Sequence, residues 1–287
     1  MQLSDFRCQA RLRVRWAEVD MQRIVFNAHY LMYIDTAMMD YWRALALPYE
    51  ASMEHLGGDM YVKKATLEYN ASAREGDSLT VGLRCARVGN SSCQFLAGIF
   101  RGEQLLVSGE LIYVYANPAT QRPLPVPPDL RALFEAFEGG DEVTQLNVGS
   151  GADIGPAAEA LLDEVLLEKG LTSVPQQAAD DAGTVHAMVS NRFGHVVATG
   201  RVKQQPAGVS RIAGMAVQRT VRGAGLGRQV LEALVQAAQQ RGDTSVVVDA
   251  TAGTQAFYER AGFSVCGARF EASGIAHIPM QRALFAR

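Results

Sequence analysis

The proline-rich segment of residues 117–128 constrains the fold of this chain more than any other feature. It reads NPATQRPLPVPP and holds five of the ten prolines in a chain of 287 residues. Proline has a fixed φ and no backbone N–H, so the segment cannot form a central strand or a helix interior. A chain of this length normally folds as two domains. We therefore expect a boundary at Glu138-Gly139-Gly140-Asp141, with domains of residues 1–138 and 143–287.

The composition excludes several classes of protein. Apolar residues make up 48%, charged residues make up 20%, and the net charge of −3 offers no basic surplus for nucleic acid. No apolar run approaches the roughly 18 residues of a membrane span, and the N-terminus lacks the apolar stretch of a signal peptide. We expect a cytoplasmic protein with no metal, nucleic-acid or membrane partner. No C-x-x-C pair occurs among its four cysteines, which are Cys8, Cys85, Cys93 and Cys266.

The first half has the pattern of an α+β domain. Residues 6–16 alternate apolar and polar side chains, which predicts a half-buried strand. Apolar residues then recur at helical spacing and predict a long helix over residues 28–47, ending near Pro48. Breaks rich in Gly, Asn and Asp separate the later strands and imply a meander of antiparallel hairpins. The expected strands are residues 60–71, 78–88, 92–101 and 104–116, and a short helix, DLRALFEAF, follows them.

The second half alternates strands and helices and predicts an α/β domain with helices packed on a sheet. The expected strands are residues 143–149, 184–190, 195–203, 210–218 and 245–249, with two more closing the domain. The expected helices are residues 155–169, 225–241 and 252–261.

A glycine-rich turn, Arg222-Gly223-Ala224-Gly225-Leu226-Gly227, joins an expected strand to an expected helix. Glycines let the backbone approach an anion, and a helix N-terminus presents free N–H groups to it. A pyrophosphate is the natural ligand. The spacing of the glycines differs from the G-x-G-x-x-G of a dinucleotide-binding site. The chain also lacks the G-x-x-x-x-G-K-[ST] motif, so a nucleotide-phosphate site of a kinase-like enzyme ranks low. A turn that only begins a helix is the alternative.

This turn resembles the R/Q-x-x-G-x-G/A signature of the GNAT acyltransferase superfamily. Residues 251–263, TAGTQAFYERAGF, resemble its later F-Y-E…G-F segment, and residues 271–280 resemble its closing strands. His186 lies where one GNAT branch often has a histidine. The resemblance covers residues 143–287 and implies a mixed sheet and transfer of an acetyl or other acyl group from coenzyme A to an amine.

The GNAT resemblance also implies roles for individual residues. Tyr258 would protonate the departing CoA thiolate as general acid, although a core tyrosine is the alternative. Thr251 departs from the amide residue that often binds CoA there. Glu271 and His277 are the candidates for the base. The implied cofactor-binding residues are Met215, Ala216, Val217, Arg222, Gly223, Ala224, Gly225, Leu226, Gly227 and Arg228.

An acidic loop, residues 15–30, precedes the first long helix and reads RWAEVDMQRIVFNAHY. A carboxylate near a helix start can activate water or attack a carbonyl, but a turn or capping residue is the alternative for Asp20. The loop resembles that of the hot-dog thioesterases of the 4-hydroxybenzoyl-CoA type, and the resemblance covers residues 5–137. It implies that Asp20 is catalytic and that the substrate-binding residues are Glu18, Asn27 and Tyr30. It also implies a homodimer or homotetramer formed through the hot-dog domain.

Arg23 is the clear departure from the thioesterase pattern, which usually has glycine there. A second departure is His29, where the pattern has asparagine. Arg23 could block a close approach of substrate, or it could reach an anionic group. Two hypotheses follow. The chain hydrolyses acyl-CoA with its first domain and transfers acyl groups from acetyl-CoA or another acyl-CoA with its second. Alternatively, one domain is inactive and serves as an acyl-CoA sensor or a dimerising scaffold.

Overall fold

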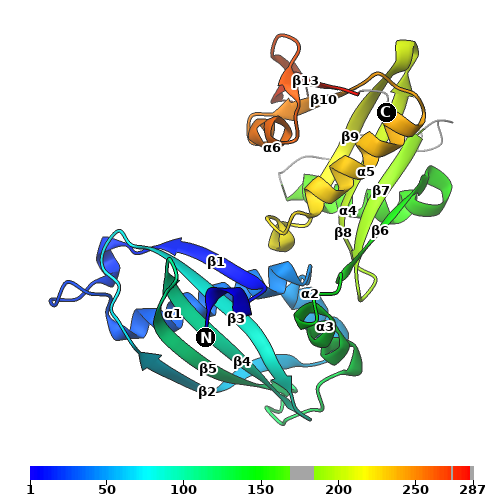
Figure 1. The fold of residues 1–287 in the computed structure, drawn as a ribbon. Coiled ribbons are helices and arrows are strands. Elements are labelled where there is room, and N and C mark those ends of the chain that lie inside the picture. The colour runs from blue at the N-terminus through cyan, green and yellow to red at the C-terminus, as the bar shows by residue number, and fades with distance from the viewer. Residues whose placement is uncertain (169–183, 273, 285–287) are drawn as a thin grey trace. The chain divides into compact units, whose positions relative to one another are not determined.

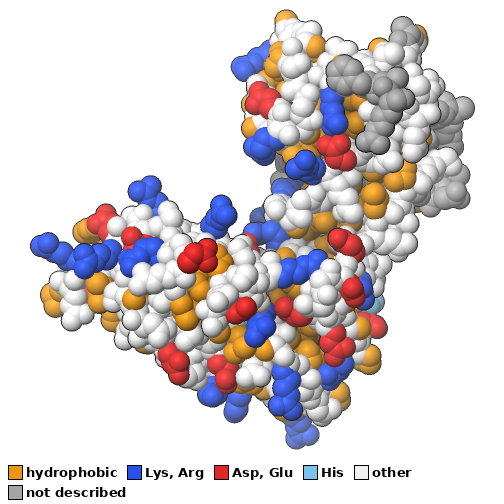
Figure 2. All heavy atoms as spheres, in the orientation of Figure 1, with side chains coloured by type: hydrophobic (Ala, Val, Ile, Leu, Met, Phe, Trp, Pro, Cys, Tyr) orange, Lys and Arg blue, Asp and Glu red, His pale blue; other side chains and the backbone are white. Residues whose placement is uncertain are grey.

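The computed structural model describes residues 1–168, 184–272 and 274–284 (Figure 1). The chain divides into two compact units, Met1–Val143 and Thr144–Arg287. On the visible face, Lys and Arg side chains are interspersed with Asp and Glu (Figure 2), in keeping with a net charge close to zero. None of the described helices has the length and apolar character needed to cross a membrane.

In the first unit, a five-stranded antiparallel sheet packs against one long helix, α1. The strand order is β1-β3-β4-β5-β2, and α1 spans Asn27–Ala44. This is the hot-dog arrangement that the sequence predicts. The strands are β1 (Cys8–Arg13), β2 (Asp59–Tyr69), β3 (Ser78–Val88), β4 (Ser92–Arg101) and β5 (Gln104–Ala116), and the further helices are α2 (Tyr49–Leu56) and α3 (Pro128–Glu138).

The aromatic core explains why α1 and α3 pack on the same sheet. Tyr41 of α1, Phe95 of β4 and Phe134 of α3 are fully buried, with ring centroids 5.3–6.1 Å apart. Burying one such side chain stabilises the fold by about 1.5–3 kcal/mol. The Tyr41 hydroxyl donates a 2.6 Å hydrogen bond to Glu138 at the end of α3, so the polar tip is satisfied as well.

Two expectations for this unit are wrong. The strands are not a simple meander, because β2 pairs with β5 at the far edge while β3 pairs with β1. Turn residues mark where a chain reverses, but they do not say which strand it then joins. The predicted helix over residues 28–47 ends at Ala44, and α2 begins directly after Pro48. Proline has the φ of a first helical turn, so Pro48 marks the start of a helix as well as the end of one.

In the second unit, a mixed sheet of order β11-β13-β10-β9-β8-β7-β6 packs with helices α4 and α5. Among the described strands only β9 and β10 pair in parallel, as the expected mixed sheet requires. The closing strands number three rather than two, and the last predicted helix is shorter than expected. The strands are β6 (Thr144–Ser150), β7 (Thr184–Asn191), β8 (Val196–Gln205), β9 (Val209–Val217), β10 (Ser245–Thr251), β11 (Ser264–Val265), β12 (Phe270–Ala272) and β13 (Ile275–Ala283). The helices are α4 (Gly151–Leu167), α5 (Leu226–Gln240) and α6 (Gln255–Arg260).

Candidate active sites

A β-bulge interrupts β9 in the second unit. Gly214 and Met215 of β9 together face the single residue Gly200 of β8. Gly214 has a φ of 60°, a conformation that favours glycine. A Cβ on Gly200 would lie 2.4 Å from the sulfur of Met215, so a larger residue there would displace that side chain. The bulge lies at the start of residues 215–217, which the sequence predicts to bind the cofactor. It redirects backbone N–H and C=O groups that a regular strand would use for hydrogen bonds to its neighbours.

The parallel strands β9 and β10 pair only over part of their length. Residues 209–212 of β9 pair with residues 245–248 of β10. Beyond Ile212, the described part of β10 offers β9 no ladder partner. The bulge begins at this level, so the backbone from Ala213 to Val217 has hydrogen-bonding groups available along the edge that faces β10. An extended ligand could pair with this edge as an added strand would.

The glycine-rich turn leads from β9 to the first turn of α5. Gly223 and Gly225 have φ values of 95° and 86°. No described residue accepts a hydrogen bond from the backbone N–H of Gly223 or of residues 225–228. Free donors of this kind, together with the positive end of the helix dipole, can hold an anion. Phosphate binding by this turn stays a prediction.

The two arginines of this turn differ in their surroundings. Arg222 donates from Nε to the carbonyl of Val217 at 2.9 Å and from a terminal nitrogen to Glu168 at 3.1 Å. It therefore braces the end of β9. Arg228 is exposed in the first turn of α5. Gly227 lies so close to Val217 that an added Cβ would be 3.2 Å from its Cγ2. This small residue brings α5 against the end of β9.

Tyr258 lies on α6 and is 4% exposed. Its ring lies between Phe257 and Phe263, with centroid separations of 5.0 and 5.6 Å. Burial raises the pKa of the Tyr258 phenol to about 12, so the group carries its proton at neutral pH. A protonated phenol is what a general acid requires, but the aromatic packing also serves the core.

The other predicted positions of the second unit lie around the end of β10. Thr251, its last residue, bonds through its hydroxyl to Thr254 at 3.1 Å. His277 pairs with Thr251 across β10 and β13, and its ring stacks on Phe270 at 5.4 Å. Glu271 is exposed on β12. His277 therefore borders the strand end where β9 and β10 have separated, while Glu271 lies on the outlying hairpin.

In the first unit, Asp20 heads a tight loop before α1. Its Oδ1 accepts a 2.8 Å hydrogen bond from the N–H of Gln22, and its own N–H donates to Ile24 at 2.9 Å. A bridge between Val19 and Val25 closes the loop. Among the described residues, none bonds to Oδ2 of Asp20, so one carboxylate oxygen is held by the turn and the other is available.

Arg23 has a φ of 60°, in the left-handed region. Its N–H donates to the carbonyl of Asp20 at 2.9 Å, which completes the turn. The thioesterase pattern has glycine at this position, and the backbone supplies the reason, because a side chain in this conformation is strained. The guanidinium itself is exposed.

Glu18 is buried beside this loop, with 4% of its surface exposed. Its carboxylate accepts hydrogen bonds from the N–H of Arg15 at 2.8 Å, from Nε of Arg15 at 2.7 Å and from Tyr33 at 2.7 Å. Burial by itself would raise the pKa of Glu18, but these hydrogen bonds outweigh burial and lower it. The structure thus gives the Glu18 carboxylate three hydrogen bonds from two residues, Arg15 and Tyr33. Sequence reasoning missed Tyr33, although it lies one helical turn after Tyr30.

Tyr30 and Asn27 lie at the start of α1. The Tyr30 hydroxyl accepts a 2.8 Å hydrogen bond from the N–H of Ala73, and its ring is 2% exposed. Asn27 is exposed, and its carbonyl accepts a 3.2 Å bond from Tyr69. Within the described chain, neither residue is hydrogen-bonded to Asp20. The four predicted residues of this domain therefore share one neighbourhood without forming one network.

Large apolar side chains flank the acidic loop and are unusually exposed. Trp16 is 76% exposed, Met21 is fully exposed and Phe26 is 48% exposed. Exposed apolar side chains that form one contiguous patch mark a contact site, whereas single ones are ordinary. The sequence predicted Trp16 as the last apolar residue of a half-buried strand over residues 6–16, but β1 ends at Arg13 and Trp16 lies in a short 3-10 helix. Met21 and Phe26 were missed, because alternation and spacing do not report which side a loop side chain faces.

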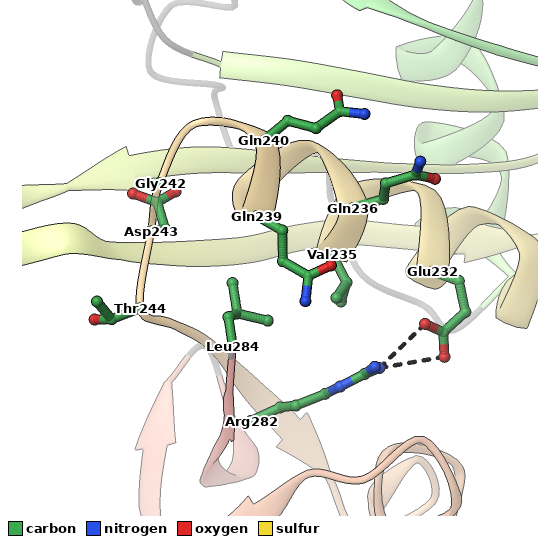
Figure 3. Close-up of a pocket in the computed structure, with 10 residues that line it drawn as sticks. All are labelled: Glu232, Val235, Gln236, Gln239, Gln240, Gly242, Asp243, Thr244, Arg282 and Leu284. Carbon is green, nitrogen blue, oxygen red and sulfur yellow. Dashed lines mark hydrogen bonds and ion pairs between the residues drawn. The ribbon is translucent and has the colours of Figure 1, made fainter. Parts of the chain in front are cut away.

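A cavity of about 800 Å³ lies at the opposite end of α5 from the glycine turn (Figure 3). The second half of α5, residues 242–244 and the end of β13 line it, and Arg282 forms an ion pair with Glu232 at 3.2 Å. None of the predicted residues lines this cavity. In the described chain, no group of three or more His, Cys, Asp or Glu side chains could hold a metal ion.

Comparisons with known proteins assign a class to each half. The model of the thioesterase-like superfamily matches residues 14–134, and that of the GNAT acetyltransferase domain matches residues 156–284. The acyl-CoA thioesterase YbgC of Haemophilus influenzae is 22% identical over 123 residues, which are 43% of this chain and 90% of that protein.

Solved structures resemble each half separately. A thioesterase from Thermus thermophilus, crystallised with coenzyme A and zinc, is 25% identical with a TM-score of 0.42, over 47% of this chain and 96% of its own. A protein from Lactobacillus plantarum, described as an N-acetyltransferase, is 25% identical with a TM-score of 0.46, over 50% of this chain and 100% of its own.

The fold and the two family matches define an enzyme made of two domains that use coenzyme A species. The chain is a fusion of a thioesterase-like, hot-dog domain and a GNAT acetyltransferase domain.

Proposed function

We propose that the second domain transfers an acyl group from coenzyme A to an amine at the bulge of β9. The observation that carries this proposal is the alignment of the bulge, the unpaired edge of residues 213–217 and the free N–H groups of the glycine turn. The edge would hold the pantetheine arm and polarise the thioester carbonyl, and the turn from Arg222 to Arg228 would hold the pyrophosphate. Tyr258 would then protonate the thiolate that leaves.

We further propose that the first domain hydrolyses acyl-CoA thioesters with Asp20 as the catalytic carboxylate. Its support is the loop geometry, which holds one oxygen of Asp20 with the N–H of Gln22 and leaves the other available. The carboxylate would activate a water or attack the thioester carbon directly. Asn27 and Tyr30 would border the substrate, while Glu18 would hold the loop in place through Tyr33.

A homodimer or homotetramer formed through the first domain belongs to this proposal. Strand β2 is an edge strand whose single partner among the described strands is β5, and most of its residues are exposed, including Val62 and Tyr69 at 52% each. An exposed edge of this length invites pairing with a second copy. Light scattering on the full chain should give a multiple of the monomer mass, and Val62→Asp should reduce it.

Thiol release from a panel of acyl-CoAs, with and without primary amines, tests both activities on the full chain. Asp20→Asn should abolish amine-independent release and leave amine-dependent release unchanged. Tyr258→Phe should do the reverse. Asp35→Asn, which removes an exposed carboxylate from α1, is the matched control. Amine-independent hydrolysis that survives Asp20→Asn would contradict the assignment of Asp20.

Arg23 favours a second candidate function for the first domain. Its side chain stands where the thioesterase pattern has glycine, so it could obstruct the substrate and leave a domain that binds acyl-CoA without hydrolysing it. Calorimetric binding of a non-hydrolysable acyl-CoA thioether, together with no thiol release from any acyl-CoA, would identify this sensor role.

A further inference from the structure

Among the buried side-chain atoms of the described second domain that lack a hydrogen-bond partner, two lie on elements that pack together. They are Nε2 of His186 on β7 and Oε1 of Glu159 on α4. The His186 side chain belongs to a residue that is 2% exposed. A buried polar atom without a partner loses its hydration and gains nothing in return, so native proteins rarely keep one without a bound water or a functional reason.

His186 lies in a row of residues that leads to the bulge. It pairs with Arg201 of β8, so their side chains share one face of the sheet. Cγ and Nε of Arg201 lie 3.7 Å from the point where a Cβ on Gly214 would stand, and Leu162 of α4 lies 3.4 Å from the same point. The row therefore lies on the face that α4 covers. Two strand spacings separate β7 from β9, which is about 10 Å.

The charges around His186 define its protonation state. Burial lowers the pKa of His186 below its ordinary value of 6.5, Arg201 lowers it further, and Glu159 of α4 opposes both effects. In the neighbouring strand β6, His186 pairs with Gly149, which carries no charge. Arg201 and Glu159 are thus the charged groups of the described chain that act on it. The ring is neutral at pH 7 and has one nitrogen that can accept a proton.

A water molecule can satisfy both orphaned atoms. It has two O–H donors, one for Oε1 of Glu159 and one for Nε2 of His186, and buried waters commonly bridge such groups. Its own lone pairs then accept a hydrogen bond from a group approaching from the bulge. The water shortens the path from the thioester to His186, which is too long for direct contact.

We propose that a water held between Glu159 and His186 receives the proton that the acceptor amine loses during acyl transfer. His186 is the proton acceptor, and Glu159 is a positioning residue that stabilises the imidazolium. The inference rests on the acyl transfer proposed above. It assigns the base to the α4 face of the sheet instead of to Glu271 or His277, the candidates from sequence.

The amine nitrogen forms a bond to the thioester carbon, and the C–S bond breaks. The sulfur takes the phenolic proton of Tyr258, and the proton of the amine passes through the water to Nε2 of His186. His186 then loses this proton to solvent, and Tyr258 regains one from solvent. The products are an amide and free coenzyme A.

The test is the dependence of kcat on pH, from about pH 5 to about pH 10, with acetyl-CoA and a panel that includes 1,4-diaminobutane, ethanolamine and glycine. Wild type should lose activity as pH falls through the lowered pKa of His186. His186→Gln should reduce kcat about 100-fold, remove this acid limb and leave KM for acetyl-CoA unchanged.

Glu159→Gln separates positioning from a purely structural role. The carboxylate raises the pKa of His186, so its loss should move the acid limb to lower pH and reduce kcat about tenfold. A structural defect would lower kcat equally at every pH. The matched controls, Glu164→Gln on the exposed side of α4 and His195→Gln in the β7–β8 turn, should keep the wild-type profile.

Two results would overturn the inference. One is an acid limb that persists in His186→Gln but disappears in His277→Gln. The other concerns a crystal structure of the wild type with coenzyme A. A water within about 3.2 Å of both orphaned atoms supports the inference, and a direct bond between them or a dry gap refutes it. If no amine is acetylated, the proposed transfer fails for that panel, and this crystal structure still decides the inference.

Discussion

The hydroxyl of Tyr33 donates a 2.7 Å hydrogen bond to the buried carboxylate of Glu18. This contact ties α1 to the loop that carries Asp20, because the carbonyl of Glu18 also accepts the N–H of Phe26 at 2.9 Å. The acid that we propose as catalytic is therefore positioned by a neighbour two residues earlier, and the neighbour is held in turn by the helix.

Tyr33→Phe should lower the free energy of unfolding by about 1.5–3 kcal/mol, the range for a hydrogen bond to a charged group. Urea denaturation of the full chain measures the loss. Tyr69→Phe is the matched control, since its hydroxyl bonds to a carbonyl at 3.2 Å and its side chain is half exposed, and it should cost less than about 1 kcal/mol. Equal losses of unfolding free energy in the two variants would mean that the hydrogen bond to Glu18 stabilises the fold no more than an exposed one does.

Glu18→Gln should flatten the acid side of the stability curve. The folded-state pKa of Glu18 lies below its ordinary value of 4.5, so the carboxylate contributes stability above that value and loses it as pH falls through the folded pKa. The variant should have a lower Tm than wild type near pH 7, and the difference should shrink toward about pH 3. A constant difference across this range would exclude linkage to Glu18.

Arg23→Gly should stabilise the first unit by about 0.5–1 kcal/mol, because glycine adopts the left-handed conformation without strain but loses more chain entropy on folding. Arg23→Ala removes the guanidinium and keeps the strain, so it should give no such gain. The pair also separates two effects on hydrolysis: if both variants raise thiol release equally, the guanidinium obstructs the site, and if only glycine does, the backbone is responsible.

Gly200→Ala should weaken binding of acetyl-CoA, measured by calorimetry. Its Cβ would lie 2.4 Å from the sulfur of Met215 and 3.0 Å from Leu234, so the side chain at the bulge must move. Overpacking of this kind costs about 1–3 kcal/mol of stability. Gly227→Ala, whose Cβ would meet Val217 at 3.2 Å in a helical turn, is the milder comparison. Unchanged affinity in Gly200→Ala would argue against acyl binding at the bulge.

Tyr258→Phe should reduce kcat for acyl transfer about 10²- to 10⁴-fold and change KM for acetyl-CoA little, as expected for loss of a general acid. The phenol, with a pKa of about 12, should contribute no alkaline limb to the rate profile of the wild type below that pH. Circular dichroism checks that the aromatic packing of α6 is retained. A kcat close to wild type would assign Tyr258 to the core alone.

Several features of this fold could be predicted from the sequence because they depend on neighbours along the chain. The hairpins formed by β3, β4 and β5 have the predicted bounds, since their turns are local and each strand alternates apolar residues. The helix after the glycine turn was predicted for the same reason, because glycines and an apolar stripe mark its start and its buried face. Motif resemblance marked Asp20 and the glycine-rich turn as candidate site residues, and their roles stay predictions.

Other features were decided only when distant segments packed together. The sequence by itself determined the approximate positions of most strands and helices, which residues could carry charge near a helix start and which two families the halves belong to. The tertiary structure alone placed β2 beside β5, set the bulge opposite Gly200 and brought His186 into a row with Arg201. The physical reason is that strand pairing and register depend on the total apolar surface that the sheet buries against its helices. This total depends on residues far apart in the chain, so no local sequence pattern contains it.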